Sequence, residues 1–183
     1  VKWVSEDDKG IYDAMNKGIA MASGRWCNFM NTGDFFFSND TLEKLFGGSD
    51  DYENFALIYG KKFFENKVYK PLPLDILKKG LIMGNHQSMF FNNEILGEDL
   101  KYDLKYPIYG DYELVNRIFL KYGSKNIHYF NLTIAHYLGG GISATPSYQK
   151  RKDKFAILLK HYGILGVLKG LCFSLKEKFI KKG

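Results

Sequence analysis

The stretch GIYDAMNKGIAMASGRWCNFMNTGD, residues 10–34, decides the fold class. Apolar residues recur every four positions over 10–22, which predicts a helix with one apolar face. The apolar run over 26–30 is typical of a buried parallel strand, and the polar residues 31–34 predict a turn after it. Helix, buried strand and polar turn in this order form half of a βαβ unit. We therefore expect an α/β fold in which ligands bind beyond the carboxyl ends of the strands.

Periodic patterns along the rest of the chain predict further elements of both kinds. Apolar runs predict strands at 1–4, 56–64, 67–69, 87–91, 127–130 and 134–138, and the strands at 56–64 and 67–69 are expected to form a hairpin around Glu65-Asn66. Helical periodicity predicts helices at 41–46, 111–122 and 149–182. Residues 71–81 are expected to be irregular. We therefore expect one α/β domain over 1–147, followed by an amphipathic, basic helical region over 148–183.

The composition is that of an ordinary globular protein, with 45% hydrophobic and 25% charged residues among 183. This length supports one compact domain with a hydrophobic core. Cys27 and Cys172 are too few for a disulfide framework, and Cys27 lies in an apolar run, which indicates a buried thiol in a reducing compartment. Residues 1–10 lack the apolar centre of a signal peptide. We therefore expect a cytoplasmic protein.

The net charge of +6 is concentrated in the last segment. From Lys150 onward, ten Lys and Arg residues accompany two acids, a local excess of +8 that leaves −2 for residues 1–149. The same segment is rich in Leu, Ile and Phe, and a basic amphipathic helix can lie in the surface of an anionic bilayer. Charged residues interrupt its most apolar part, 155–175, so we expect peripheral membrane contact through 150–182 and no membrane span. Packing against the rest of the domain or a second subunit explains the pattern equally well.

Residues 5–18 combine acids, a lysine and a glycine directly before a predicted helix. The free N–H groups at a helix start favour a phosphate, which makes the run Asp8-Lys9-Gly10 a candidate binding segment. Asp13 and Asn16 are three residues apart, so they share a helix face and can bind the same ligand. A well-capped amphipathic helix with acids at its favourable end explains the same pattern without a ligand.

This segment and four others, in order along the chain, resemble bacterial family 2 glycosyltransferases that assemble capsule, colanic acid and lipopolysaccharide side chains. The five segments are 5–18, 29–34, 86–91, 110–114 and 139–143. The resemblance implies the GT-A fold, with a mostly parallel central sheet flanked by helices. It also implies a nucleotide-sugar donor, bound beside Asp8, Lys9, Gly10, Asp13 and Asn16, and a saccharide or lipid-linked acceptor.

Asp34 corresponds to the last position of the acid cluster that binds the metal ion in this family. Transfer from a nucleotide donor must neutralise a leaving diphosphate, and Mg²⁺ or Mn²⁺ held by carboxylate oxygens does this. Here a single acid follows Asn31-Thr32-Gly33, so the diphosphate is expected to supply further ligands. A turn aspartate after Gly33 is the alternative.

Asp111 corresponds to the family's general base, which takes the proton of the acceptor hydroxyl in an inverting transfer. An ordinary aspartate at a helix start is the alternative, and Glu113 is a weaker candidate for the base. His86 and Gln87 resemble a loop that borders the acceptor, although a lone histidine is more often structural. His136, before three glycines, is a weaker candidate for a metal ligand.

Two features of the family have no counterpart between Val1 and Gly183: its Thr-Tyr-Asn-like turn and its Asp-Gly-Gly-Ser-Thr-Asp-like loop. These belong to the first strands of the family fold and hold the nucleoside, so we expect this chain to be truncated before them. A non-catalytic remnant that binds a sugar or a partner protein therefore stays open as a second function. A nucleic-acid partner is not expected, because no RNP-like, zinc-finger or helix-turn-helix signature accompanies the basic segment.

Overall fold

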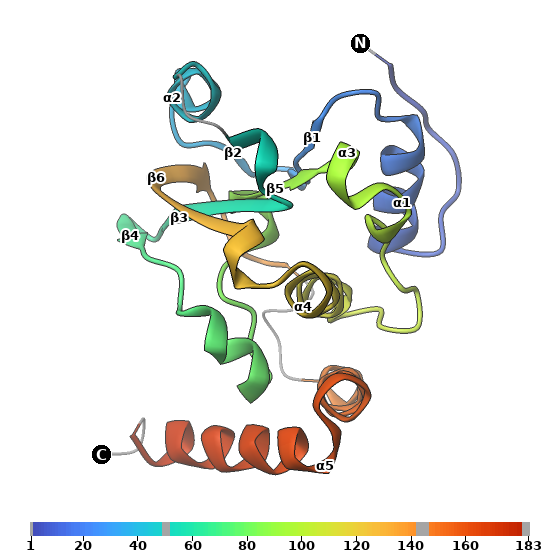
Figure 1. The fold of residues 1–183 in the computed structure, drawn as a ribbon, viewed down its shortest axis with the longest axis vertical. Coiled ribbons are helices and arrows are strands. Elements are labelled where there is room, and N and C mark those ends of the chain that lie inside the picture. Colours follow the sequence, from blue (N-terminus) through green and yellow to red (C-terminus); the bar gives the residue numbers. More distant parts are fainter. Residues whose placement is uncertain (1, 49–51, 142–146, 181–183) are drawn as a thin grey trace.

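The computed structural model describes residues 2–48, 52–141 and 147–180 (Figure 1). Its helices are α1 (Ile11–Met21), α2 (Thr41–Phe46), α3 (Asn93–Leu96), α4 (Gly110–Tyr122) and α5 (Tyr148–Ile180). Its strands are β1 (Trp26–Cys27), β2 (Phe35–Phe36), β3 (Leu57–Phe64), β4 (Lys67–Tyr69), β5 (Met89–Asn92) and β6 (Ile127–His136). Short 3₁₀ helices connect them: η1 (Tyr52–Asn54), η2 (Leu74–Lys79), η3 (His86–Ser88), η4 (Gly97–Asp99) and η5 (Ser124–Asn126).

The strands form one mixed sheet in the order β1-β5-β3-β6-β2, with β4 paired to β3. In the described part of the chain only β3 and β6 pair in parallel, and the other pairs are antiparallel. The expectation of a mostly parallel sheet was therefore wrong, whereas the α/β class is confirmed. A hairpin accounts for part of the difference: Glu65 and Asn66 adopt positive φ angles and turn β3 directly back into β4.

The apolar run 26–30 forms a strand of two residues, and this strand is antiparallel to β5. The strand ends at Cys27 because the next residue pairs through its side chain. The amide nitrogen of Asn28 donates to the carbonyl oxygens of Gln87 at 3.0 Å and Met89 at 2.9 Å. An asparagine that pairs with backbone in this way competes with the regular ladder, so the expected longer strand does not form.

The core lies on both faces of the sheet, because successive residues of β3 point to opposite sides. Leu57 and Tyr59 pack with α1, α4 and η2 in the larger cluster. Ile58 packs on the other face with Leu45 of α2. This alternation places α1 and the start of α4 on the same side of the sheet.

The other predicted helices and strands agree with the structure, with two corrections to the predicted strands. The predicted helices at 10–22, 41–46 and 111–122 are present as α1, α2 and α4. Residues 2–4 are not a strand, and Trp3 is 81% exposed, because no neighbouring strand pairs with them among the described residues. The two strands predicted at 127–130 and 134–138 are one continuous strand, β6.

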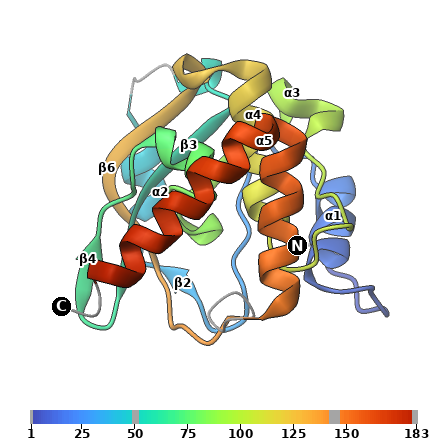
Figure 2. The same ribbon diagram turned by 90° about the horizontal axis from the view of Figure 1, so that it is seen from below.

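Helix α5 bends sharply at Gly163, whose φ of 64° lies in the left-handed region that glycine adopts without strain. The bend divides α5 into a first arm, residues 148–162, and a second arm, residues 164–180. The two arms form a V in Figure 2 and lie at the end of the molecule away from α2 in Figure 1. Gly170 lets the arms approach, because a Cβ there would lie 2.7 Å from Leu158 Cδ1.

Within the described residues, one helix is long and apolar enough to span a membrane by length and composition. It is Tyr148–Lys176, a stretch of 29 residues. The expectation that no stretch would meet this criterion was therefore wrong. The many Leu and Ile residues of this segment make a stretch of 18 residues within it apolar on average, in spite of the lysines there. The bend at Gly163, however, divides the segment into two shorter arms.

Candidate functional site

A cavity of about 930 Å³ opens between α1, η3 and the start of α4. Three residues that were predicted from widely separated segments line it together: His86, Gln87 and Asp111. Tyr12 of α1 lines the same cavity, as do Asn31 and Thr32 from the turn after β1. Residues at 137, 140 and 141 close another side. The cavity is therefore where the sequence segments of the resemblance converge, except for residues 142 and 143, which lie outside the described part of the chain.

The Asp111 carboxylate faces this cavity from the first turn of α4, with 17% of its side chain exposed. Its Oδ1 accepts a hydrogen bond from the Tyr112 backbone N–H at 2.7 Å. Its Oδ2 lies 3.6 Å from His86 Nδ1. One oxygen is thus fixed by the helix start, and the other remains available on the cavity side.

The orientation of His86 follows from its second ring nitrogen. The Asn31 side-chain amide lies 3.1 Å from His86 Nε2, and an amide N–H can only donate. Nε2 therefore accepts, and a neutral His86 ring carries its proton on Nδ1, the atom that faces Asp111. This arrangement places a polarisable N–H next to the carboxylate in the cavity wall.

Tyr12 is a site residue that the sequence reasoning missed. Its hydroxyl donates to the carbonyl of Ile108 at 3.0 Å and lies 3.3 Å from Asp111 Oδ1. Burial first, and the charge of Asp111 next, raise the pKa of the Tyr12 phenol far above its usual value, so it stays protonated. Its ring packs where Gly110 has no side chain: a Cβ there would lie 2.7 Å from the ring. In the sequence, the glycine directly before the candidate base was the feature that could have indicated a closely packed neighbour at this position.

Asp34 lies behind the cavity wall, where both of its carboxylate oxygens accept hydrogen bonds. Oδ2 accepts from the Gln87 side-chain amide at 2.7 Å, and Oδ1 accepts from the Leu138 backbone N–H at 2.9 Å. Asp34 therefore connects η3, which carries His86 and Gln87, to the segment after β6. The His136 ring packs against Phe35 and Phe63.

The fit of a divalent ion can be judged from these oxygens. In the described ranges, no three His, Cys, Asp or Glu side chains gather. However, Gln87 Oε1 is buried without a hydrogen-bond partner, and reversing that amide would turn its oxygen toward Asp34. A carboxylate and an amide oxygen are ligands of the kind that Mg²⁺ and Mn²⁺ prefer. The chain can thus offer two oxygens, and a bound diphosphate or water must complete the coordination.

The predicted donor-binding residues at the start of α1 lie apart from the large cavity. Asp8, Lys9 and Gly10 are exposed and do not line it. Asp13 and Asn16 share a face, as predicted, but that face turns toward a second cavity of about 590 Å³. The two faces of α1 therefore line two different cavities.

Both residues on that second face already have partners within the chain. The Asn16 side chain pairs with the backbone of Tyr102 through two hydrogen bonds of 2.9 and 2.7 Å. Asp13 accepts a hydrogen bond from the Lys9 N–H at 2.9 Å, which is the main reason that the pKa of this carboxyl is lowered. These contacts hold the start of α1 in place and anchor the loop before α4.

A buried carboxylate on α4 is the centre of a cluster of ion pairs between α4 and α5. Glu113 has no exposed side-chain surface, and it pairs with Arg117 of α4 and with Lys160 and His161 of α5. Burial alone would raise the pKa of Glu113, but hydrogen bonds from His161 and Lys160, with the charge of Arg117, outweigh it and lower the pKa to about 2. Glu113 therefore ties α5 to the helix that carries Asp111.

Comparison with known proteins supports a relationship to glycosyltransferases. No family model matches the chain. A "PGL/p-HBAD biosynthesis glycosyltransferase" of Mycobacterium bovis is 28% identical over 143 residues, which are 76% of this chain and 56% of that protein. An "uncharacterized glycosyltransferase" of Mycobacterium tuberculosis is 33% identical over 121 residues, which are 63% of this chain and 46% of that protein.

The chain thus spans about half the length of the curated relatives that it matches. The match to the first relative covers 143 residues, a length close to the 139 residues from the first to the last segment of the resemblance, 5–143. By sequence, the chain is similar to glycosyltransferases over about three quarters of its length.

Proposed function

We propose that this protein transfers a sugar from a nucleotide-diphosphate sugar to a hydroxyl of a saccharide or lipid-linked acceptor, with inversion at the anomeric carbon. The observation that carries this proposal is the convergence of Asp111, His86 and Gln87 on one cavity, in a chain similar to glycosyltransferases. We further propose that the mixed α/β core belongs to a family 2 enzyme of GT-A type that acts in surface-polysaccharide assembly.

In the proposed reaction, the acceptor hydroxyl oxygen forms a bond to the anomeric carbon while the bond to the diphosphate breaks. The hydroxyl proton passes to Asp111 Oδ2, the oxygen without a backbone hydrogen bond. The Tyr112 N–H at the helix start holds the other carboxylate oxygen, and the Tyr12 hydroxyl packs beside it, so the base keeps one orientation. His86 supplies an N–H beside the same carboxylate and limits where the acceptor can lie.

The leaving diphosphate carries away the bonding electron pair and has to be neutralised. We propose Mg²⁺ or Mn²⁺ for this role, held by Asp34 and the Gln87 side-chain oxygen in addition to the diphosphate. The ion supplies positive charge to the leaving group when bound. Before an ion binds, the hydrogen bonds that Asp34 accepts from Gln87 and from the Leu138 N–H connect the segment after β6 to η3, which carries His86.

The direct test is transfer by the whole natural polypeptide, assayed with UDP-, GDP- and dTDP-sugars and saccharide acceptors. We expect nucleoside diphosphate to be released only when an acceptor is present, to stop after EDTA treatment, and to return when Mn²⁺ or Mg²⁺ is added. Asp34→Asn is expected to weaken the response to added metal. A folded sample that gives no heat with nucleotide or nucleotide sugar in calorimetry contradicts the proposal and favours a non-catalytic binding module.

A partner for α5 is proposed from the surface of its second arm. Five apolar side chains there are more than half exposed: Ile164, Leu165, Leu168, Leu171 and Leu175. Their spacing places them on one stripe of the helix, and Phe173, on the opposite side, packs against the core.

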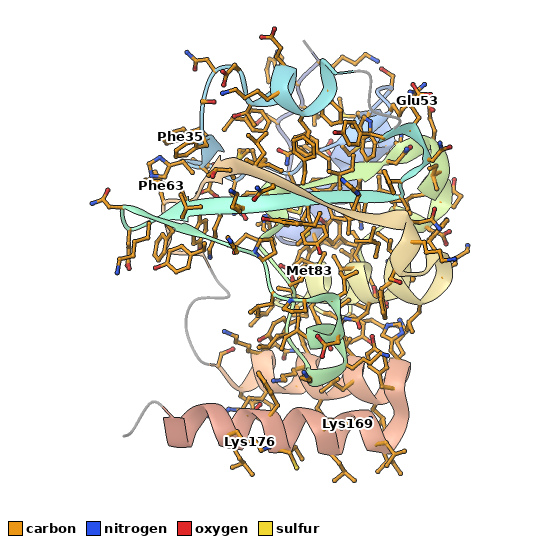
Figure 3. The ribbon with its side chains drawn as sticks, turned by 60° about the vertical axis from the view of Figure 1, so that its left-hand side comes forward. Phe35, Glu53, Phe63, Met83, Lys169 and Lys176 are labelled. Carbon is orange, nitrogen blue, oxygen red and sulfur yellow. The ribbon has the colours of Figure 1, made fainter. Side chains whose placement is uncertain are left out.

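Lys169 and Lys176 border the exposed stripe, and both lie at the end of the molecule opposite Glu53 (Figure 3). An apolar stripe next to lysines matches an anionic bilayer, in which the apolar side chains enter the interface and the ammonium groups meet lipid phosphates. We therefore propose peripheral attachment at the inner face of the cell membrane, where a lipid-linked acceptor would be located.

This contact can be measured by sedimentation with lipid vesicles. The protein is expected to sediment with vesicles of phosphatidylcholine mixed with phosphatidylglycerol, and less with phosphatidylcholine alone. The variant Leu165→Glu/Leu168→Glu is expected to bind the anionic vesicles at least about tenfold more weakly, because two leucines no longer enter the apolar layer. Leu42→Glu, at an exposed leucine on α2, serves as the control and should bind normally.

A different result would assign the stripe to protein contact. Wild-type protein that forms a dimer in the absence of lipid, becomes a monomer in the Leu165→Glu/Leu168→Glu variant and never sediments with vesicles contradicts the membrane proposal.

A further inference from the structure

Lys62 of β3 is a half-buried cation without a carboxylate partner among the described residues. Its Nζ lies 5.2 Å from the ring centroid of Tyr137, 5.5 Å from that of Tyr69 and 5.6 Å from that of Phe64. It donates one hydrogen bond, to Asn85 Oδ1 at 2.8 Å. Three aromatic rings and one amide therefore surround an ammonium group that no described acid neutralises.

This environment is costly for a positive charge. Burial lowers the pKa of Lys62, and no carboxylate in the described ranges raises it again. Lys160 is also partly buried, but its positive charge is neutralised by an ion pair with Glu113. Aromatic faces attract a cation only weakly compared with a full negative charge. Two of the three N–H groups of Lys62 also have no acceptor in the described part of the chain.

The position of Lys62 connects this unbalanced charge to the large cavity. Asn85 and Tyr137, two of its four neighbours, line the cavity. Asn85 directly precedes His86, which lies beside Asp111. A ligand in this part of the cavity would therefore contact the Asn85 amide and the Tyr137 ring, which hold Lys62. Only these side chains would separate an anionic group there from the positive charge of Lys62.

We propose that Lys62, together with Asn85 and Tyr137, forms a subsite for a phosphate group of a substrate at this end of the cavity. The proposal rests on the proposed function, since it takes the cavity as the place of sugar transfer. Lys62 lies behind Asn85 and Tyr137 and does not itself line the cavity. A phosphate that enters between these two side chains offers oxygens to the two unused N–H groups and supplies negative charge, and lysine binds phosphate as a compact point charge. The donor diphosphate and a phosphorylated lipid-linked acceptor are two sources of the same chemistry.

The first test measures binding of inorganic pyrophosphate and of UDP by calorimetry. Lys62→Met keeps the length of the side chain and removes its charge, and we expect it to weaken binding of at least one probe about tenfold or more. Lys62→Arg is expected to retain most of the affinity. Lys61→Met is the matched control, because Lys61 is the adjacent, similarly half-buried lysine of β3 and should leave binding unchanged.

Thermal unfolding separates a binding role from a structural one. Since Lys62 is buried without a counter-charge, Lys62→Met is expected to keep or raise the melting temperature. A lower melting temperature with unchanged binding of both probes would overturn the subsite. Absence of any pyrophosphate or UDP binding by the wild-type protein would overturn it as well.

Steady-state kinetics then identify the source of the phosphate. If the donor occupies the subsite, Lys62→Met raises KM for the nucleotide sugar and leaves KM for the acceptor unchanged. If the acceptor occupies it, KM rises for a phosphorylated acceptor and stays unchanged for the corresponding methyl glycoside. Transfer by Lys62→Met with wild-type values of all these constants overturns the subsite but leaves the proposed transferase function intact. A wild-type protein that binds pyrophosphate and transfers no sugar contradicts only the proposed function.

Discussion

Replacing Asp111 with Asn is expected to slow sugar transfer about 10²- to 10⁴-fold, which is the usual contribution of a general base. Asparagine is nearly the same size, and its oxygen can still accept from the Tyr112 N–H and lie beside the Tyr12 hydroxyl. The geometry of the cavity wall should therefore persist, while the side chain can no longer accept the proton of the acceptor. The loss should appear in kcat, with KM for donor and acceptor changed little.

The control for this experiment is Asp75→Asn, an exposed aspartate of η2 that pairs with Lys79 away from the cavity. It removes the same charge and should leave kcat unchanged. Circular dichroism and the melting temperature show whether both variants fold. Turnover at the wild-type rate in folded Asp111→Asn protein would exclude Asp111 as the base and direct attention to the neighbouring His86.

The parts of the fold that could be predicted from sequence depend on local patterns. Helices α1, α2 and α4 and the β3–β4 hairpin were predicted within one or two residues, because their apolar periodicity and turn residues are contained in each segment. Strand direction is different, since it depends on which distant segment supplies the partner. Nothing within 26–30 shows that its partner is β5 or that Asn28 ends the strand by binding the next segment.

The candidate site shows the same limit. Spacing on α1 correctly put Asp13 and Asn16 on one face, but the loop that contains Tyr102 occupies that face. Tyr12, one residue from Asp13, reaches Asp111 instead. The direction in which a helix face turns is decided by tertiary packing, and 86 residues separate Asn16 from the backbone that it binds. The resemblance to a family predicted roles for both sets of residues. In the structure Asp111, His86 and Gln87 line one cavity, whereas Asp13 and Asn16 line another.

Glu113 also shows how tertiary packing changes the meaning of a sequence position. From sequence it was a first-turn acid of α4 and a weak candidate for the base. In the structure it is fully buried, because Lys160 and His161 of α5 cover it from 47 and 48 residues away. Its carboxylate therefore forms ion pairs between α4 and α5. Glu113 does not line the large cavity, whereas Asp111 does.

The second large effect is expected from Glu113→Gln, which removes the carboxylate partner of Arg117 and leaves Lys160 with only the more distant Asp103, at 3.6 Å. Breaking a buried ion pair from one side costs about 3 kcal/mol at the lower end of the usual range, and Arg117 and Lys160 are exposed enough to recover some hydration. For a protein of this size, that loss corresponds to a melting temperature lower by about 6–12 °C. Glu98→Gln, at an exposed acid of η4, is the control and should change little.

The pH dependence distinguishes the ionic contribution of Glu113 from a simple packing defect. The pKa of Glu113 is about 2 in the folded state, below the ordinary value of 4.5 that applies when the chain is unfolded. Its stabilisation is therefore fully present above pH 4.5 and is lost as the pH falls toward 2. We expect the difference in unfolding free energy between wild type and Glu113→Gln, measured by urea denaturation, to shrink over this range. A difference that stays constant from pH 7 to below 4.5 would show that Glu113 stabilises the contact of α4 with α5 by shape and not by charge.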